Sequence, residues 1–174
     1  MIVEALCAAV IALGMHNADN ACKHMETVVE ASKQYDVDPA LMVALIYVES
    51  RWTDNAKSNA GACGLTQVIP KWTGGKATGG KKYTCSQLQQ NPKLSIEVGT
   101  QIYSWWLRKY AYCKPNKWCS PQRRKISLCG YNAGFRCKDR DGVQANRAGM
   151  NYARVVLRRE SIIKRKMRQL REKQ

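Results

Sequence analysis

One carboxyl group in this sequence stands where its affinity for a proton should be high. Glu49 ends an almost wholly apolar stretch, residues 41–48, and a glycine-containing segment that includes Gln67 follows at residues 61–70. Removal from water disfavours the charged form of a carboxyl group, so an acid in such surroundings holds its proton near neutral pH. A protonated carboxyl beside hydrogen-bonding side chains is what a general acid needs to cleave a sugar bond.

The element that must position this acid is predicted as a helix over residues 39–51. Asp38 can cap the first amides of such a helix, and Pro39 suits its first position. The segment is apolar nearly all round, which predicts a buried central helix. Glu49 then lies at the negative end of the helix dipole, which raises its pKa further. The alternative interpretation is an ordinary ion pair between Glu49 and Arg51 or a lysine.

The rest of the chain shows helical spacing of apolar residues and almost no strand-like alternation. Its length suits one domain with a core of its own. The sequence therefore predicts a mainly α fold. The other expected elements are helices over residues 21–35, 94–112, 122–129 and 152–174, loops over 53–63 and 74–82, the latter flexible and basic, and a turn over 130–134 that ends the fourth helix.

Eight cysteines, an even number scattered along the chain, indicate disulfide bonds formed outside a reducing cytosol. A zinc site is disfavoured because the chain has no Cys-x-x-Cys pair and both histidines lie far from the closest cysteines. We accordingly expect no metal and no cofactor. Spacing does not determine the pairing, and the short-range candidates are Cys113–Cys119 and Cys129–Cys137.

The formal net charge of +16 implies a polyanionic partner, such as nucleic acid, an anionic membrane or a cell wall. Nucleic acid is disfavoured because no binding motif occurs and the lysines are not interleaved with exposed aromatic residues. Much of the charge lies in residues 157–174, around an apolar helical stripe. This segment is either a solvated surface helix with one packed face or a docking helix for an anionic surface or a partner protein.

Residues 1–15 are apolar but lack the basic flank of an export signal, carry Glu4 there instead, and are too short to span a bilayer. We expect them to form a helix packed on the domain. The predicted organisation is an N-terminal helical segment at 1–36, a catalytic domain at 37–156 and a basic C-terminal helix at 157–174.

Three motifs in order, at residues 49–70, 91–103 and 131–134, resemble those of the soluble lytic transglycosylases of glycoside hydrolase family 23. The resemblance covers roughly residues 37–156 and ends near Tyr152. It implies a lysozyme-like transglycosylase domain and peptidoglycan glycan strands as the substrate.

By this resemblance, Glu49 is the only catalytic acid and base. It would protonate the glycosidic oxygen between N-acetylmuramic acid and N-acetylglucosamine, and then take the proton of the muramic 6-hydroxyl as that oxygen closes on C1. The product is a 1,6-anhydromuramyl end, and no water is consumed. One carboxylate is then sufficient, whereas ordinary glycosidases use two.

The resemblance also assigns substrate-binding positions to Ser58, Gln67, Tyr131 and Asn132, and Tyr131 could hold the Glu49 carboxyl in place. Each has a simpler alternative. Ser58 could cap a turn, Gln67 could satisfy buried backbone groups, and residues 131–134 could be only the end of a helix.

Some residues depart from the family's pattern. Thr66 stands in place of a usual Met, which could change the shape of the sugar subsite. Cys63 lies inside the motif, where a disulfide would make the wall of the sugar cleft rigid. Goose-type lysozymes, which hydrolyse the same bond, tend to carry Asp where this chain has Ile69–Pro70, and the motif offers only Asp54 to activate water. Transglycosylation is therefore favoured over hydrolysis.

Aromatic side chains could also contribute by stacking on sugar rings. The candidates are Trp52, Trp72, Tyr83 and Trp118, whereas Trp105 and Trp106 are expected in the core.

Disulfides without a convincing export signal fit an enzyme mounted on a phage tail or a secretion-type assembly, acting outside the cytoplasm. We favour a virion-associated enzyme, bound to other proteins through the basic C-terminal helix. The alternatives are an adaptor with a vestigial site and a goose-type lysozyme-like hydrolase.

Overall fold

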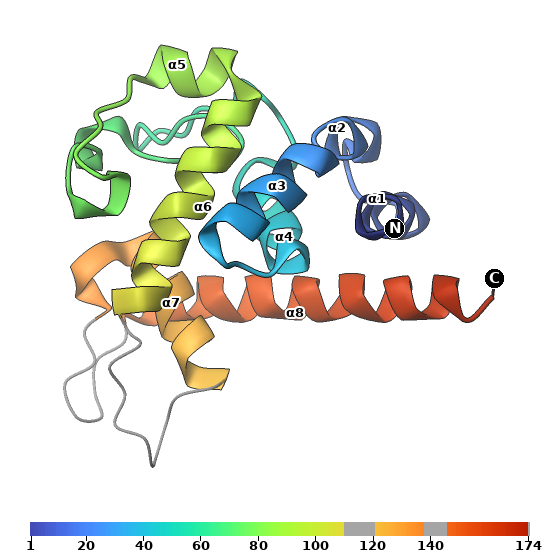
Figure 1. Cartoon of the computed structure of the whole chain (residues 1–174). Coiled ribbons are helices and arrows are strands. Elements are labelled where there is room, and N and C mark those ends of the chain that lie inside the picture. Colours follow the sequence, from blue (N-terminus) through green and yellow to red (C-terminus); the bar gives the residue numbers. More distant parts are fainter. Residues whose placement is uncertain (110–120, 138–145, 174) are drawn as a thin grey trace.

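The computed structural model describes residues 1–109, 121–137 and 146–173. Within these ranges the chain is helical, and its β structure is limited to two isolated bridges, Lys57 with Cys63 and Cys63 with Val68. The expectation of a mainly α fold is confirmed. The elements are α1 (Ile2–Ala12), α2 (Ala18–Lys23), α3 (Met25–Tyr35), α4 (Pro39–Ser50), the 3-10 turns η1 (Pro70–Trp72) and η2 (Lys76–Thr78), α5 (Cys85–Gln90), α6 (Pro92–Lys109), α7 (Pro121–Ala133), the 3-10 turn η3 (Gly134–Arg136) and α8 (Arg147–Arg171) (Figure 1).

The central helix α4 forms as the sequence predicts and ends one residue earlier. Its first turn is capped by Asp38, whose Oδ1 accepts a hydrogen bond from the Ala40 amide at 2.9 Å. Every residue from 40 to 46 is buried, because α3 and α8 pack against this helix from different sides. The apolar run thus becomes the core of the molecule.

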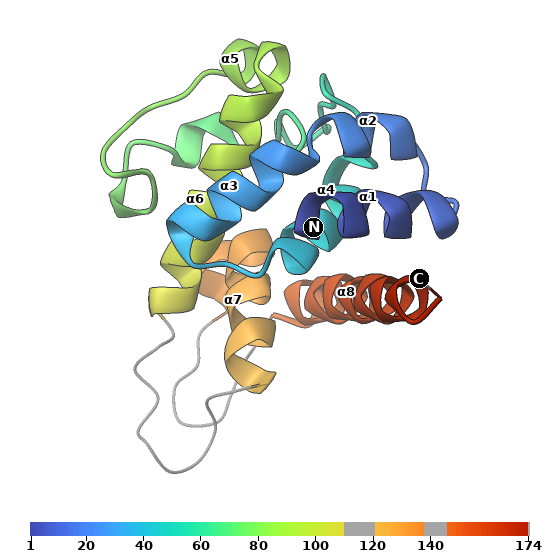
Figure 2. The same cartoon turned by 45° about the vertical axis from the view of Figure 1, so that its right-hand side comes forward.

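The longest helix, α8, runs horizontally below α4 and α1 in Figure 1, and its C-terminal half lies beside α1 in both views (Figure 2). It begins five residues before the predicted start, because the Asn146 side chain caps it by accepting the Gly149 amide at 3.0 Å. The helix is continuous through residues 156 and 157, so the predicted boundary there lies inside one element.

The predicted helix over residues 21–35 is instead two helices, α2 and α3, with a break at His24. The break lets α2 leave the line of α3, so that Cys22 reaches Cys7 on α1. The expected N-terminal packing is confirmed, since Leu6, Ala9 and Val10 of α1 are buried in the core. In the described part of the chain, no helix is long and apolar enough to cross a membrane.

Helix α6 begins at Pro92, two residues before its predicted start, because Asn91 Oδ1 accepts the Leu94 amide at 3.0 Å. Its predicted end at Tyr112 lies outside the described residues. The segment 74–82, expected to be a flexible loop, contains η2 and has internal hydrogen bonds. The buried Thr78 hydroxyl donates to the Lys81 carbonyl at 2.8 Å and accepts the Gly74 amide at 2.9 Å.

The predicted turn over residues 130–134 is wrong, since α7 continues to Ala133. Gly130 serves packing rather than a turn: a Cβ there would lie 2.6 Å from a ring carbon of Trp106, so only glycine lets α7 approach α6 this closely. The chain leaves the helix at Gly134, which has the positive φ of +63° that glycine adopts without strain.

Three disulfides are present among the described residues, Cys7–Cys22, Cys63–Cys85 and Cys129–Cys137. The expectation of disulfides is confirmed, and so is the short-range pair Cys129–Cys137. The other short-range candidate, Cys113–Cys119, lies outside the described residues.

Candidate active site

Glu49 lies in the last turn of α4, half-buried, and its carboxyl is held from α8. The Tyr152 hydroxyl donates a hydrogen bond of 2.6 Å to Glu49 Oε1. Burial raises the pKa of Glu49 to about 7, and the hydrogen bond from Tyr152 opposes this by stabilising the carboxylate. An acid with a pKa near 7 gives up and regains its proton readily at neutral pH, as a group that acts first as acid and then as base requires.

Tyr131 lies close to this pair but does not hold the carboxyl. Its hydroxyl donates to the Thr66 carbonyl at 2.7 Å, and its ring meets the Tyr103 ring edge-on at 6.4 Å between centroids. Burial and the nearby Glu49 carboxyl raise the pKa of the Tyr131 hydroxyl, so it stays protonated as a donor. The expectation that Tyr131 orients Glu49 is therefore wrong. Tyr152, which the sequence marked only as the end of the resemblance, makes that contact.

The loop beside Glu49 is attached to α6 through Thr66. Its hydroxyl donates to the Ser95 carbonyl at 2.7 Å, and the side chain is fully buried against Gly99, where any Cβ would overlap it. Thr66 thus faces the core, and the expectation that it changes the shape of the sugar subsite is not supported. Thr66 fixes the backbone of this loop, and its own carbonyl accepts the hydrogen bond from the Tyr131 hydroxyl.

Gln67 takes a left-handed backbone conformation with φ of 49° and stays half-exposed. Its Nε2 donates to the carbonyls of Gly64, at 2.9 Å, and Ala56, at 3.2 Å. These are the backbone contacts of the simpler interpretation, and they also fix the side chain in one orientation. A role in sugar binding stays a prediction.

Ser58 and Asn132, the two other predicted site residues, make no contact with Glu49 that the described residues show. Ser58 is half-buried, and its Oγ accepts the Ala62 amide at 3.1 Å, which closes the turn between them. Asn132 is exposed on α7, next to Tyr131. Substrate contacts for both remain predictions.

The loop is fixed on its other side by a disulfide, as the position of Cys63 suggested. Cys63 is buried and bonded to Cys85, the first residue of α5. The adjacent Gly64 has φ of +75°, and a Cβ there would overlap the Leu88 carbonyl of α5. The segment that carries Gln67 is therefore held by α5, α6 and α7 at once.

Comparison with known proteins shows the family of this chain. The sequence model of the family described as "Transglycosylase SLT domain" matches residues 26–153. The chain belongs to this family.

Two relatives of the SLT domain are named membrane-bound lytic murein transglycosylases. Transglycosylase E of Buchnera aphidicola is 31% identical over 106 residues, which are 59% of this chain and 48% of that protein. Transglycosylase C of Salmonella paratyphi B is 30% identical over 137 residues, 75% of this chain and 37% of that protein. The SLT domain described here therefore spans about half or less of the length of these curated relatives.

The fold is also that of a solved transglycosylase structure. Lytic transglycosylase Slt from Pseudomonas aeruginosa, determined as an inactive mutant with a glutamine in place of a glutamate, superposes with a TM-score of 0.65 at 17% identity. The superposition covers 93% of this chain and 30% of that one. At this sequence identity, the similarity shows that the two proteins share a fold.

The aromatic residues expected to stack on sugars behave differently from one another. Trp52 is 0% exposed in the core, so its predicted role in stacking is wrong. Trp72 is 72% exposed on η1 and stays a candidate, Tyr83 is half-buried, and Trp118 lies outside the described residues. Trp106 is buried as expected, whereas Trp105 is half-exposed and packs edge-on against it.

Asp54, the one carboxylate considered for water activation, is engaged by two residues N-terminal to the matched region, Asn20 on α2 and His24. Its Oδ1 accepts a hydrogen bond from Asn20 Nδ2 at 2.8 Å and lies 3.1 Å from His24 Nε2. These contacts hold the carboxylate toward α2 and α3, which disfavours its use as a base for a hydrolytic water.

Proposed function

We propose that this SLT domain cleaves the β-1,4 bond between N-acetylmuramic acid and N-acetylglucosamine in peptidoglycan and leaves a 1,6-anhydromuramyl end. The observation that carries the proposal is the carboxyl of Glu49, with a pKa near 7 and a hydrogen bond from Tyr152, within the fold of this family. The net positive charge of the chain favours binding to an anionic wall polymer.

In the first step, protonated Glu49 gives its proton to the glycosidic oxygen as the bond to C1 breaks. The resulting carboxylate is stabilised by the Tyr152 hydroxyl, which already donates to Oε1. In the second step, this carboxylate takes the proton of the muramic 6-hydroxyl while its oxygen bonds to C1. Glu49 ends the cycle protonated, so the reaction needs neither water nor a second carboxylate.

The product distinguishes this proposal from goose-type hydrolysis. Anhydro ends and reducing ends differ in mass by one water. We expect mass spectrometry of purified sacculi digested by the domain to show anhydromuropeptides as the dominant new ends. Reducing ends as the main product would contradict transglycosylation and would make Asp54, or another base, the next residue to examine.

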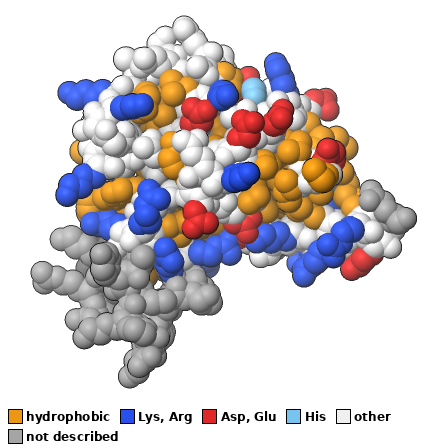
Figure 3. Space-filling view, in the orientation of Figure 1, with side chains coloured by type: hydrophobic (Ala, Val, Ile, Leu, Met, Phe, Trp, Pro, Cys, Tyr) orange, Lys and Arg blue, Asp and Glu red, His pale blue; other side chains and the backbone are white. Residues whose placement is uncertain are grey.

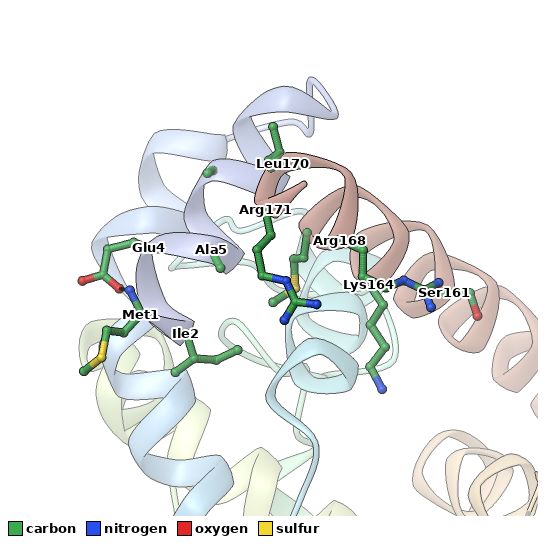
Figure 4. Close-up of a pocket in the computed structure, with 11 residues that line it drawn as sticks. Met1, Ile2, Glu4, Ala5, Ser161, Lys164, Arg168, Leu170 and Arg171 are labelled. Atoms are coloured by element: carbon green, nitrogen blue, oxygen red, sulfur yellow. Dashed lines mark ion pairs between the residues drawn. The ribbon is translucent and has the colours of Figure 1, made fainter. Parts of the chain in front are cut away.

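We further propose that the domain works outside the cytoplasm as a fixed component of a larger assembly, with a phage tail favoured over a secretion machine. Hydrophobic side chains gather over α1, and lysines and arginines lie along α8 below them (Figure 3). Between the two helices is a groove of about 840 Å³ (Figure 4). Its lining combines apolar residues with exposed cations, Ile2, Ala5, Leu170, Arg168 and Arg171 among them.

This groove gives a test of the assembly role that is separate from catalysis. Replacing Arg168 and Arg171 together by Glu should reduce incorporation of the domain into the particle roughly tenfold or more. Two charges that attract an anionic surface of the partner protein would then repel it. Cleavage of soluble glycan strands by the purified variant should stay unchanged, because this measurement does not depend on binding to the wall. Normal incorporation of this variant would contradict docking through α8. A wild-type domain that is incorporated but releases nothing would instead support the adaptor hypothesis.

A further inference from the structure

The chain leaves the catalytic helix through an unusual turn. Arg51, with φ of 50°, and Trp52, with φ of 60°, directly follow Glu49 and Ser50, and both are in the left-handed region. Residues with a side chain rarely adopt this conformation, and two in succession persist only when their surroundings hold them. The fully buried side chain of Trp52 helps to keep both residues in this conformation.

Hydrogen bonds from α2 and from the residue before it also stabilise this turn. Asn17, which precedes α2, donates from Nδ2 to the Arg51 carbonyl at 3.0 Å. Asn20 donates from Nδ2 to the Trp52 carbonyl at 2.7 Å and to Asp54 Oδ1 at 2.8 Å, so both of its amide hydrogens are used on this one turn. The two asparagines thus pair with two consecutive carbonyls of the turn that follows α4.

The residues that do this lie outside the part of the chain that matches the family, which begins at residue 26. They belong to a helical hairpin of α1 and α2, closed by the disulfide Cys7–Cys22. Through α1 this hairpin also packs on α8, the helix that carries Tyr152. One N-terminal unit therefore contacts both elements that bring Glu49 and Tyr152 together.

We infer that Asn20, assisted by Asn17, is a positioning residue that fixes the last turn of α4 and so keeps Glu49 against Tyr152. At the end of α4 the Arg51 amide donates to the Tyr47 carbonyl at 3.0 Å, and Glu49 lies within the turn that this bond closes. If the turn after it is released, this last helical turn can fray and Glu49 can swing toward water. The inference rests on the proposed role of Glu49, but it can be tested without catalysis.

The test compares Asn20→Ala with Asp19→Ala, a matched change at an exposed position of the same helix. The primary measurement is the titration of the Glu49 carboxyl by carbon-13 NMR, since its pKa depends on burial. The groups that face Glu49 are Tyr152 on α8 and Tyr131 on α7, and neither is altered by these changes.

In Asn20→Ala we expect the pKa of Glu49 to fall from about 7 toward the ordinary value of 4.5, because the carboxyl becomes more solvated. Tyr152→Phe should shift it the opposite way, upward, because it removes the donor that stabilises the carboxylate. With soluble glycan strands, kcat of Asn20→Ala should fall roughly 10- to 100-fold with little change in KM, as expected when a reacting group is misplaced. Asp19→Ala should change neither quantity.

An Asn20→Ala variant that melts at a lower temperature but keeps the Glu49 titration and kcat of the wild type would overturn the inference, leaving α2 a merely structural role. If Asn20→Ala does not fold, Asn17→Gly is the second variant, because glycine adopts the φ of 55° at this position without strain. It removes the bonds from Asn17 Nδ2 to the Arg51 carbonyl and to Thr53 Oγ1 and should give a smaller shift in the same direction; no shift there would equally overturn the inference. A wild-type domain without transglycosylase activity would refute the proposed function, while the titration would still decide the role of Asn20.

Discussion

Replacing Glu49 by Gln is expected to abolish the release of anhydromuropeptides from purified sacculi, with a fall in rate of roughly a thousandfold, as for the loss of a general acid. Glutamine keeps the shape of the side chain and can still accept the hydrogen bond from Tyr152, but it has no proton to give. Chromatography with mass spectrometry of the soluble products measures the effect. Undiminished release would show that Glu49 is not the acid.

The same variant should be more stable than the wild type in alkaline solution, which separates lost chemistry from lost folding. The pKa of Glu49 rises from 4.5 in the unfolded chain to about 7 in the folded protein, so the folded state binds the proton more tightly. This contribution to stability is fully present below pH 4.5 and is lost as the pH rises through 7, where the folded protein must hold a buried charge.

Glutamine has no charge to bury, so its advantage should be on the order of 3 kcal/mol at about pH 8 and should vanish at about pH 4. Thermal or urea unfolding at the two pH values measures this difference. Glu30→Gln, at an exposed position on α3, is the matched control and should show no such dependence. Equal stability of wild type and Glu49→Gln at both pH values would mean that the carboxyl is not desolvated.

The helix that carries Glu49 could be predicted because its signals are local. Asp38 and Pro39 start it, and an unbroken apolar run identifies it as buried, so neither inference depends on the rest of the chain. Tyr152 is 103 positions away from Glu49, and no local pattern connects the two. The site could therefore be located from the sequence, while the partner that holds its acid could not.

The predictions for Gly130 and Trp52 were wrong for the same physical reason. Gly130 predicted a turn because a turn needs conformational freedom, whereas in the molecule it makes room for the Trp106 ring. As an aromatic residue, Trp52 is a candidate for stacking on sugars, yet its side chain lies in the core after the left-handed turn that follows α4. Both outcomes depend on which elements meet, and this is decided by tertiary packing. The disulfides follow the same rule: of the three in the described residues, the sequence suggested both partners only for Cys129–Cys137, which are the closest along the chain.

A second large effect is expected at a cluster of charges between α7, α8 and the start of α4. Glu160 on α8 is only 3% exposed and forms ion pairs with Arg124 on α7 and with Lys164, the latter at 2.8 Å. Lys164 also pairs with Asp38, the residue that caps α4. Beside them, burial raises the pKa of the Tyr103 hydroxyl on α6, which keeps it neutral. A buried carboxylate of this kind is tolerated only while its partners are in place.

Arg124→Met removes one partner. Among the described residues, Glu160 then keeps an ion pair only with Lys164, which is half-exposed and shared with Asp38. We expect the free energy of unfolding to fall by about 3 kcal/mol and the melting temperature by about 10 °C. The double variant Arg124→Met/Glu160→Leu should recover most of this loss, because it replaces the charged pair by apolar side chains.

Arg158→Met, at an exposed position on α8, controls for the loss of one positive charge from the surface and should change stability little. Thermal unfolding of the four proteins at neutral pH measures the comparison. A double variant no more stable than Arg124→Met would show that the two charges are not coupled. The expected coupling would mean that the pair of Arg124 and Glu160 fixes α8 against α7. Since α8 also contacts the start of α4 through Lys164 and Asp38 and its end through Tyr152 and Glu49, the same charge cluster would help to position the helix that carries Tyr152.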